Sequence, residues 1–205
     1  DSQLRDEVVT MLLAGHETIA VVLTWAWARL DRHREVATRL HGELRSVLGD
    51  RVPGADDLQQ LPYTRAVISE TLRLHPPAYP ILRHVQEDDV VCQQRIHKGG
   101  GVVISPLILH RHPAYWEQPD EFLPERWLDA EAEQRRPRYA YIPFSAGPRK
   151  CIGSSFSMME AMLILPPLAQ RFIPRLIAAD WPATEYLVLA RPAGAVAMQP
   201  GARAA

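Results

Sequence analysis

Apolar residues recur at three- and four-residue spacing along three stretches of the chain, which is the pattern of amphipathic helices. The first stretch covers residues 3–30, the second 33–48 and the third 63–75. We expect Gly49-Asp50 to end the second helix and Pro76-Pro77 to end the third, because glycine and proline commonly terminate helices. The pattern therefore predicts three helices in the amino-terminal part of the chain.

A fourth apolar run covers residues 153–172 and predicts a further helix. Pro166-Pro167 lies inside this run. An internal proline lacks the N–H that would bond the carbonyl four residues earlier, and it costs a helix about 3 kcal/mol. We therefore expect a kink or an early end at this pair.

Between and after these helices the pattern is short, broken and rich in turn residues, which favours small strands. The expected strands are residues 81–83, a hairpin of 90–92 with 95–97, then 102–105, and in the tail 186–189 with 195–198. Residues 106–143 are rich in proline, aromatic and charged residues and predict an irregular segment. The whole pattern predicts a mainly α fold with small antiparallel β-sheets, an α+β class.

Composition limits the function classes. Hydrophobic residues make up 47% of the 205 residues and charged residues 23%, as in ordinary globular chains. The net charge of −1 gives no argument for nucleic acid as a partner. Two cysteines far apart in sequence suit a reducing compartment. No run of 18 apolar residues and no signal peptide is visible, so we expect no membrane segment in this part and a cytoplasmic location.

The start of the chain adds an expectation about its extent. It opens Asp1-Ser2-Gln3 and enters a helical pattern at once, without a methionine. This start predicts a part of a longer polypeptide that begins inside a helix.

The stretch from Phe144 to Gly153 carries the first candidate chemistry, because it contains Cys151. Its glycines let the backbone turn tightly and approach a flat ligand. Arg149, Lys150 and the positive end of the following helix favour a thiolate over a thiol. Cys151 is therefore a candidate metal ligand, and the alternative is an inert cysteine in a surface loop.

The middle of the first helix carries the second candidate site. Gly15 costs roughly 1 kcal/mol relative to alanine inside a helix, and Thr18 can donate its hydroxyl to the carbonyl of Ala14, which bends helices. A bend with a glycine, an alcohol and Glu17 can form a pocket for a small molecule, and the alternative is a solvated helix face. A zinc motif His-Glu-x-x-His is excluded, because Ala20 stands where the second histidine is required.

Both segments resemble motifs of the cytochrome P450 superfamily. The loop is similar to the family's heme-ligand pattern Phe-x-x-Gly-x-Arg-x-Cys-x-Gly, whose fixed positions are filled by Phe144, Gly147, Arg149, Cys151 and Gly153. The helix segment is similar to the pattern Ala-Gly-x-Glu/Asp-Thr, filled by Ala14, Gly15, Glu17 and Thr18. The resemblance implies that the loop holds heme b through a thiolate and that dioxygen binds beside the helix segment. It also implies that the threonine steadies the dioxygen and that the glutamate relays protons to it.

Two further matches concern the scaffold of the heme. Glu70 and Arg73 fill the family's Glu-x-x-Arg, and Arg126 lies in a segment similar to Pro-Glu-Arg-Phe. The resemblance implies that these three side chains form a buried network that braces the core behind the heme, whereas an exposed pair would contribute only a few tenths of a kcal/mol. Arg83 and Arg149 are implied to bind the heme propionates, since arginine binds carboxylates through two parallel hydrogen bonds.

The resemblance covers residues 1–205 as the carboxy-terminal part of one cytochrome P450 domain. It implies a heme-thiolate monooxygenase that inserts one atom of dioxygen into a small organic substrate of unknown identity. The substrate pocket would include Ala78, Tyr79, Pro80 and Ile81. No flavin or iron–sulfur motif occurs, so electrons would come from a separate ferredoxin- or flavoprotein-type donor.

Three alternatives stay open at this point. The first is a heme-thiolate isomerase or a peroxide-using enzyme, against which the intact Glu17-Thr18 pair argues. The second is a non-catalytic fragment that binds heme poorly, because it lacks the upstream helices that would cover the heme. The third is an enzyme with Cys151 as nucleophile, but no organised base accompanies the cysteine. The remaining cysteine, Cys92, is expected to be a small core residue, and the histidines of residues 106–143 are expected to be loop and packing residues.

Overall fold

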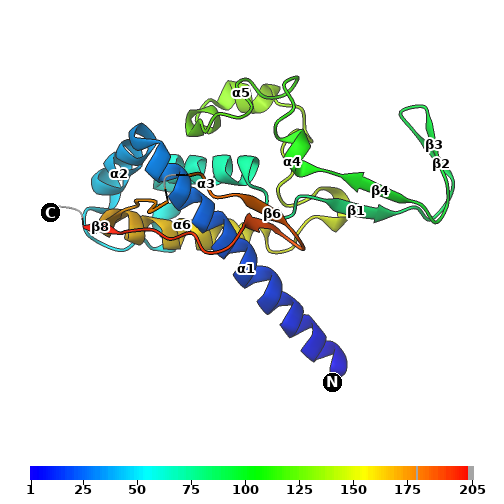
Figure 1. Ribbon diagram of the computed structural model, residues 1–205, viewed down its shortest axis with the longest axis horizontal. Coiled ribbons are helices and arrows are strands. Elements are labelled where there is room, and N and C mark those ends of the chain that lie inside the picture. Colours follow the sequence, from blue (N-terminus) through cyan, green and yellow to red (C-terminus); the bar gives the residue numbers. More distant parts are fainter. Residues whose placement is uncertain (179, 203–205) are drawn as a thin grey trace.

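The computed structural model describes residues 1–178 and 180–202, and its long helices meet around one buried helix, α3. Figure 1 shows α1 (Ser2–Arg32), α2 (Arg34–Leu48) and α6 (Ser154–Arg171) against α3 (Pro62–Leu74). The fold is mainly helical with small antiparallel sheets, as the pattern predicts.

α3 is buried along most of its length and forms the centre of the core. Pro62 at its first position needs no intrahelical partner. Glu43 on α2 accepts the next two free amides, from Tyr63 at 2.6 Å and Thr64 at 2.8 Å. A side chain of a neighbouring helix therefore caps α3 and fixes its start against α2.

α2 packs by a stripe of apolar residues at every fourth position, which faces α3 and α6. These residues are Val36, Leu40, Leu44 and Leu48. The helix ends at Gly49, whose φ of +59° suits glycine. The predicted apolar face and the predicted end are both confirmed.

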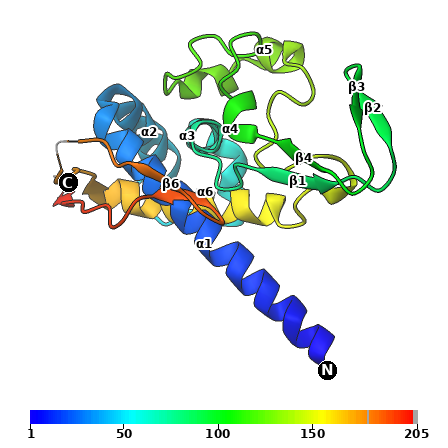
Figure 2. The ribbon, with the colours of Figure 1, turned by 45° about the vertical axis from the view of Figure 1, so that its right-hand side comes forward.

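α1 divides into an exposed half and a buried half. Residues 2–18 are exposed or half-buried, and the core contribution begins at Ile19 and includes the fully buried Trp25. Figures 1 and 2 show the amino-terminal half projecting from the body as one rod. The predicted single helix over residues 3–30 is confirmed, because α1 is helical without a break from Ser2 to Arg32, and the expected bend at residues 14–18 stays a prediction.

By length and composition α1 could cross a membrane, since its most apolar 18-residue window has a mean hydropathy of 1.6. One such helix is weak support, because core helices and signal sequences pass the same test. From Ile19 onward α1 contributes to the protein core. The expected absence of a membrane segment stays a prediction.

α6 runs through both prolines to Arg171, so the expected early end is wrong, and the alternative, a kink, stays a prediction. Pro166 is buried, as are the neighbours Leu165 and Ala169 on the face that contacts the core. Packing of this face outweighs the hydrogen bond that the proline cannot make.

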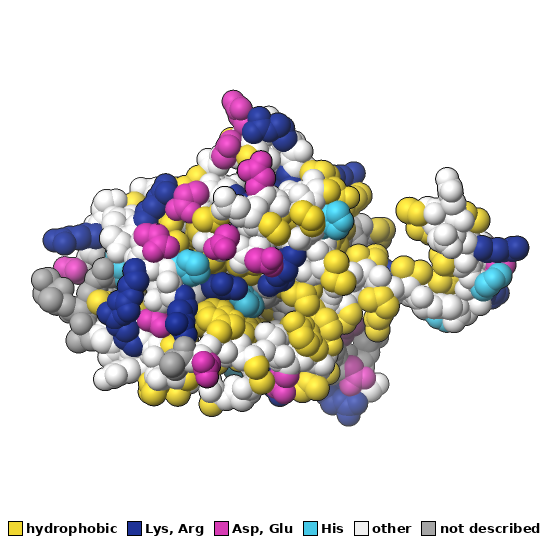
Figure 3. Space-filling view, turned by 45° about the horizontal axis from the view of Figure 1, so that its top comes forward, with side chains coloured by type: hydrophobic (Ala, Val, Ile, Leu, Met, Phe, Trp, Pro, Cys, Tyr) yellow, Lys and Arg dark blue, Asp and Glu magenta, His cyan; other side chains and the backbone are white. Residues whose placement is uncertain are grey.

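Within residues 1–178 and 180–202 the strands form four separate antiparallel pairs. The pairs are β1 (Ile81–His84) with β4 (Gly101–Ile104), β2 (Asp89–Val91) with β3 (Gln94–Ile96), β5 (Phe172–Ile173) with β8 (Gly201–Ala202), and β6 (Thr184–Tyr186) with β7 (Ala190–Pro192). The β2–β3 hairpin stands clear of the body in Figure 3. Its turn is Cys92-Gln93, both with positive φ, so Cys92 is exposed and the expectation of a core residue is wrong.

The predicted tail strands are wrong in detail. Residues 187–189 form the turn between β6 and β7, and Val188 at the turn is 91% exposed. Of the second predicted strand, Met198 makes only an isolated bridge to Leu176. The apolar residues 187–189 were expected in a strand but form the tip of a hairpin. Apolar content alone does not distinguish a strand from an exposed turn.

Residues 106–143 are irregular, as predicted, with short helical turns. α4 (Pro106–Leu109) and η2 (Pro124–Trp127) pack beside α3, and α5 (Ala130–Arg135) packs on η2. Short turns elsewhere in the described chain are η1 (Ala55–Gln60) and η3 (Gly147–Arg149).

Candidate functional site

The loop before α6 is held in one shape by its own backbone hydrogen bonds. The amide of Cys151 donates to the carbonyl of Phe144 at 2.9 Å, which closes the loop, and the amide of Lys150 donates to Gly147 at 3.1 Å. Gly147 has a φ of +71°, and Ser145, a non-glycine residue, has a φ of +63°. Left-handed backbone at Ser145 is costly, so the closed loop imposes this shape.

Cys151 is exposed and lies three residues before α6, whose first amide, Ser154, donates to the Cys151 carbonyl at 3.4 Å. A side chain at Gly153 would place its Cβ 3.8 Å from Cys151 Sγ, so the glycine leaves the space beside the sulfur free. Ile152 next to it is 93% exposed. The sulfur therefore lies on an open, partly apolar face of the molecule.

The donor set tests whether a heme fits here. Within residues 1–178 and 180–202, no three His, Cys, Asp or Glu side chains gather in a group that could hold a metal ion. Cys151 therefore belongs to no such group, and an iron already held by a macrocycle would need only one axial ligand, such as this cysteine. The residues present fit a heme.

Arg83 lies beside this loop. It follows Ile81 by two positions on β1, and its Nη2 donates to Ser145 Oγ at 3.2 Å. Arg149, the other predicted propionate ligand, is exposed and makes no hydrogen bond or ion pair within the described part of the chain. The structure therefore brings Arg83 to the loop, and both guanidinium groups are near it.

The Ala14–Thr18 segment has the predicted hydroxyl bond and an additional ion pair. Thr18 Oγ1 donates to the carbonyl of Ala14 at 2.7 Å, as predicted. Gly15 is half-buried, and a Cβ placed on it would have no neighbour within 4 Å. Glu17 accepts a hydrogen bond from Arg191 on β7 at 3.3 Å.

The two predicted parts of the site share no polar contact. Among the residues that the structure describes, no hydrogen bond or ion pair joins Glu17 or Thr18 to the loop of residues 144–153. A cavity of about 180 Å³ lies between α1, α3 and β6 and is lined by residues that include Trp25 and Arg111. The residues that line this cavity come from neither predicted part of the site.

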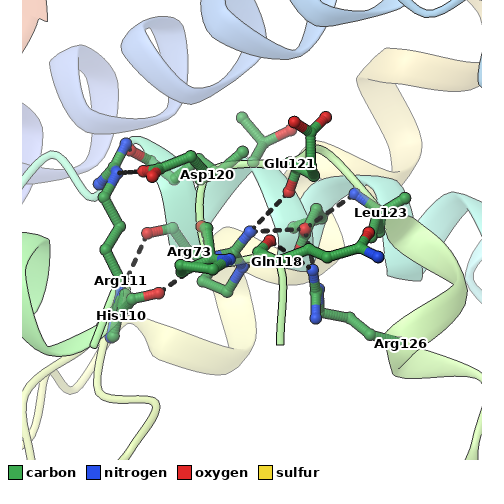
Figure 4. A network of polar contacts seen from close by, with 12 residues as sticks. Arg73, His110, Arg111, Gln118, Asp120, Glu121, Leu123 and Arg126 are labelled. Carbon is green, nitrogen blue, oxygen red and sulfur yellow. Dashed lines mark hydrogen bonds and ion pairs between the residues drawn. The ribbon is translucent and has the colours of Figure 1, made fainter. Parts of the chain in front are cut away.

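The predicted Glu70–Arg73–Arg126 network is present and completely buried at its centre (Figure 4). Five donors surround the two oxygens of the Glu70 carboxylate at 2.8–3.0 Å. They are Arg73 Nε and Nη2, the Leu123 amide, Arg126 Nε and Trp127 Nε1. No lone exposed pair would collect so many partners, so the exposed-pair alternative is wrong.

Burial alone would raise the pKa of Glu70. The hydrogen bonds and charge of Arg73, the charge of Arg126 and the Leu123 amide outweigh burial, and the pKa of Glu70 lies below its ordinary value. Arg73 also donates to three carbonyls of the irregular segment, those of His110, Pro119 and Glu121. The network therefore fastens residues 110–127 to α3.

His110 extends this fastening to the segment before the cysteine loop. Its Nδ1 lies 3.2 Å from the carbonyl of Arg73, and its Nε2 accepts from the amide of Ile142 at 2.9 Å. Burial lowers the pKa of His110 to about 3, so the ring is neutral and Nδ1 carries the proton. The Ile142 carbonyl in turn accepts a hydrogen bond from the Ser145 amide at 3.0 Å. Ile142 therefore links His110 to the cysteine loop through its backbone.

Sequence reasoning missed three of these partners. Trp127 was visible only as part of a motif, and its indole donation to Glu70 has no sequence signal. His110 was assigned to packing, and its neutral bridge depends on complete burial. Arg191 reaches Glu17 across 174 positions of sequence, which no local pattern marks.

Comparison with known proteins gives a single answer. The family model described as Cytochrome P450 matches residues 1–192. The chain is 45% identical over 172 residues to Cyclooctatin synthase of Streptomyces melanosporofaciens, covering 84% of this chain and 37% of that protein. It is 43% identical over 171 residues to Cytochrome P450 4V2 of Homo sapiens, covering 82% of this chain and 32% of that protein.

A solved structure agrees along nearly the whole chain. The heme domain of a cytochrome P450DA mutant superimposes with a TM-score of 0.92 at 30% sequence identity. The match covers 99% of this chain and 44% of that one. The chain therefore spans about a third of the length of the curated relatives quoted above and under half of this heme domain.

Proposed function

The chain belongs to the cytochrome P450 family, and we propose that it forms the carboxy-terminal part of a heme-thiolate monooxygenase. The reaction class is insertion of one oxygen atom into a small organic substrate. Dioxygen, two electrons from a separate donor and two protons give the oxygenated product and water. Family membership and the exposed cysteine loop support this proposal.

The single observation that carries it is the geometry of Cys151. The thiol is free and exposed, the loop around it is closed by the Cys151–Phe144 backbone bond, and α6 begins just after it. The positive end of a helix stabilises a nearby anion. When bound, a heme with a thiolate ligand supplies dioxygen activation, because the thiolate donates electron density that favours O–O cleavage.

Arg83 and Arg149 would hold the carboxylates of heme b. Arg83 is already fixed beside the loop by Ser145, whereas Arg149 is free to reach a ligand. Two guanidinium groups match two propionates in number and charge.

Glu17 and Thr18 would deliver protons. Glu17 is 51% exposed at its side chain, so it can exchange protons with solvent. The Thr18 hydroxyl donates its hydrogen bond to the Ala14 carbonyl, but its oxygen keeps lone pairs that can accept another hydrogen bond. To donate toward a ligand, Thr18 must first release Ala14.

A second candidate is a heme-poor fragment without activity. It is favoured by the open position of Cys151 and by the share of the relatives' length that this chain spans. On this reading the 205-residue chain alone would not retain heme, whereas a longer gene product would.

The test is oxygen incorporation with labelled dioxygen. The protein, expressed with whatever precedes Asp1 in its gene, is supplied with a ferredoxin- or flavoprotein-type donor, a reductant and a panel of small organic substrates. Label in the product supports a monooxygenase. Thr18→Ala should lower the amount of product formed per electron consumed. Thr24→Ala should not lower it, although it loses the same kind of hydroxyl-to-carbonyl bond elsewhere on α1. Turnover that needs peroxide alone, or rearrangement without label, would assign the protein to the isomerase or peroxygenase class instead.

A further inference from the structure

Arg191 joins the β6–β7 hairpin to α1. It lies on β7, and its Nη1 donates to Glu17 Oε1 at 3.3 Å, while its Nε donates to Glu185 Oε1 at 2.6 Å. Glu185 is the cross-strand partner of Arg191 on β6. One guanidinium therefore binds two carboxylates from two different elements.

The backbone that carries Arg191 is fixed from several sides. The amide of Ala190, one residue earlier, donates to the carbonyl of Pro77 at 2.9 Å. Tyr79 Oη donates to the carbonyl of Leu187 at the turn of the same hairpin at 3.0 Å. Residues 77–79 thus hold the hairpin, and the hairpin holds Arg191 at a set position.

Glu17 has no comparable support of its own. It lies on the largely exposed half of α1, where Arg191 is its only hydrogen-bond or ion-pair partner among the described residues. Without that contact the carboxylate is free to turn toward solvent on its flexible side chain. The guanidinium thus decides where this carboxylate lies.

We propose that Arg191 is the positioning residue for Glu17 in proton delivery, a role that rests on the proposed monooxygenase function. Among the described residues, no hydrogen bond or ion pair joins Arg191 to Thr18, so Arg191 would act through Glu17. It acts by holding the Glu17 carboxylate against β7, and Glu185 holds Arg191 in turn through the Nε atom. An exposed ion pair contributes little to stability, so a loss of stability would not explain a large kinetic effect of a substitution at Arg191.

The kinetic test compares Arg191→Gln, Glu17→Gln and the double variant. Each single variant should lower oxygenated product per electron consumed about tenfold and raise the solvent isotope effect, since proton delivery then limits the reaction. The double variant should lose about tenfold rather than a hundredfold, because both changes remove one function. Arg191→Lys should restore most of the coupling, since the ammonium still binds Glu17. Glu185→Gln is the matched control, because it removes the charge of the other partner but keeps the Oε1 oxygen that accepts from Arg191 Nε. Arg191 then stays in place, and the isotope effect should change little.

A readout independent of heme tests the contact itself. Thermal unfolding midpoints of the same variants should show coupling between Glu17 and Arg191, as a double variant shifted by less than the sum of the single shifts. The shifts are expected to stay below about 4 °C, because the pair is exposed.

Two results overturn the proposal in distinguishable ways. A wild type that transfers no labelled oxygen overturns the proposed function and this role with it. A wild type that does so, with an Arg191→Gln variant whose isotope effect is unchanged, overturns the role of Arg191 alone.

Discussion

Replacing Glu70 with glutamine should remove the anion at the centre of the buried network and leave its shape almost intact. The NH₂ group of the glutamine would replace one carboxylate oxygen. The N–H groups that now donate to that oxygen would then face another donor and lose their acceptor. Arg73, fully buried, would lose Glu70, its only carboxylate partner among the described residues. Breaking a buried ion pair by removing one partner costs about 3–5 kcal/mol. Domains of this kind have a total unfolding free energy of about 5–15 kcal/mol, so Glu70→Gln should leave a chain that is barely stable.

Urea unfolding followed by circular dichroism measures this cost. The midpoint temperature should also fall by roughly 6–20 °C, at about 2–4 °C per kcal/mol for a chain of this size. Glu125→Gln is the matched control, since this carboxylate also binds an arginine, Arg39 at 3.0 Å, but is 46% exposed. The control should cost less than about 1 kcal/mol. A Glu70→Gln variant within 1 kcal/mol of the wild type, like the control, would refute the view that the network holds the irregular segment on α3.

Other predictions follow from the histidine bridge and from two glycines. Because burial lowers the pKa of His110 to about 3, the unfolded chain takes up a proton below pH about 6.5 that the folded chain does not. The His110 contribution to stability is therefore complete above that pH and is lost by about 1.4 kcal/mol per pH unit as the pH falls toward 3. The unfolding free energy of His110→Gln should differ less between pH 7 and pH 5 than that of the wild type. A difference equal to that of the wild type would contradict the bridge. Gly147→Ala should cost about 1–2 kcal/mol, because φ is +71° there, whereas Gly15→Ala in α1 should stabilise by about 0.5–1 kcal/mol. The two variants should therefore shift the urea midpoint in opposite directions, and a neutral Gly147→Ala would contradict the backbone argument.

The parts of the fold that depend on local pattern were predictable. The α2 stripe and the Gly49 terminus each follow from residue spacing or turn chemistry. The hairpin was predicted one residue too late in the sequence, with Cys92 in a strand instead of in the turn. The Thr18–Ala14 bond was also predictable, because it spans four residues of one helix. The three-residue spacing of Glu70 and Arg73 indicated their contact, and the family resemblance added Arg126.

The remaining features depend on packing between distant segments. α6 continues through Pro166 because its buried face holds it in place, a contribution that sequence propensity does not contain. The apolar residues Leu187 and Val188 form an exposed turn, and only the pairing of β6 with β7 reveals this. Contacts such as His110–Ile142 and Glu17–Arg191 join segments whose separation in sequence hides them.

The most direct test of the central claim is the carbon monoxide difference spectrum of the reduced protein, expressed with whatever precedes Asp1 in its gene. The account predicts the strongly red-shifted Soret band of a thiolate-ligated heme in the wild type. It predicts the same band in Cys92→Ser, whose cysteine lies on the β2–β3 turn, and the loss of that band in Cys151→Ser. A wild type without the band, or a Cys151→Ser protein that keeps it, would contradict the assignment of Cys151 as the iron ligand.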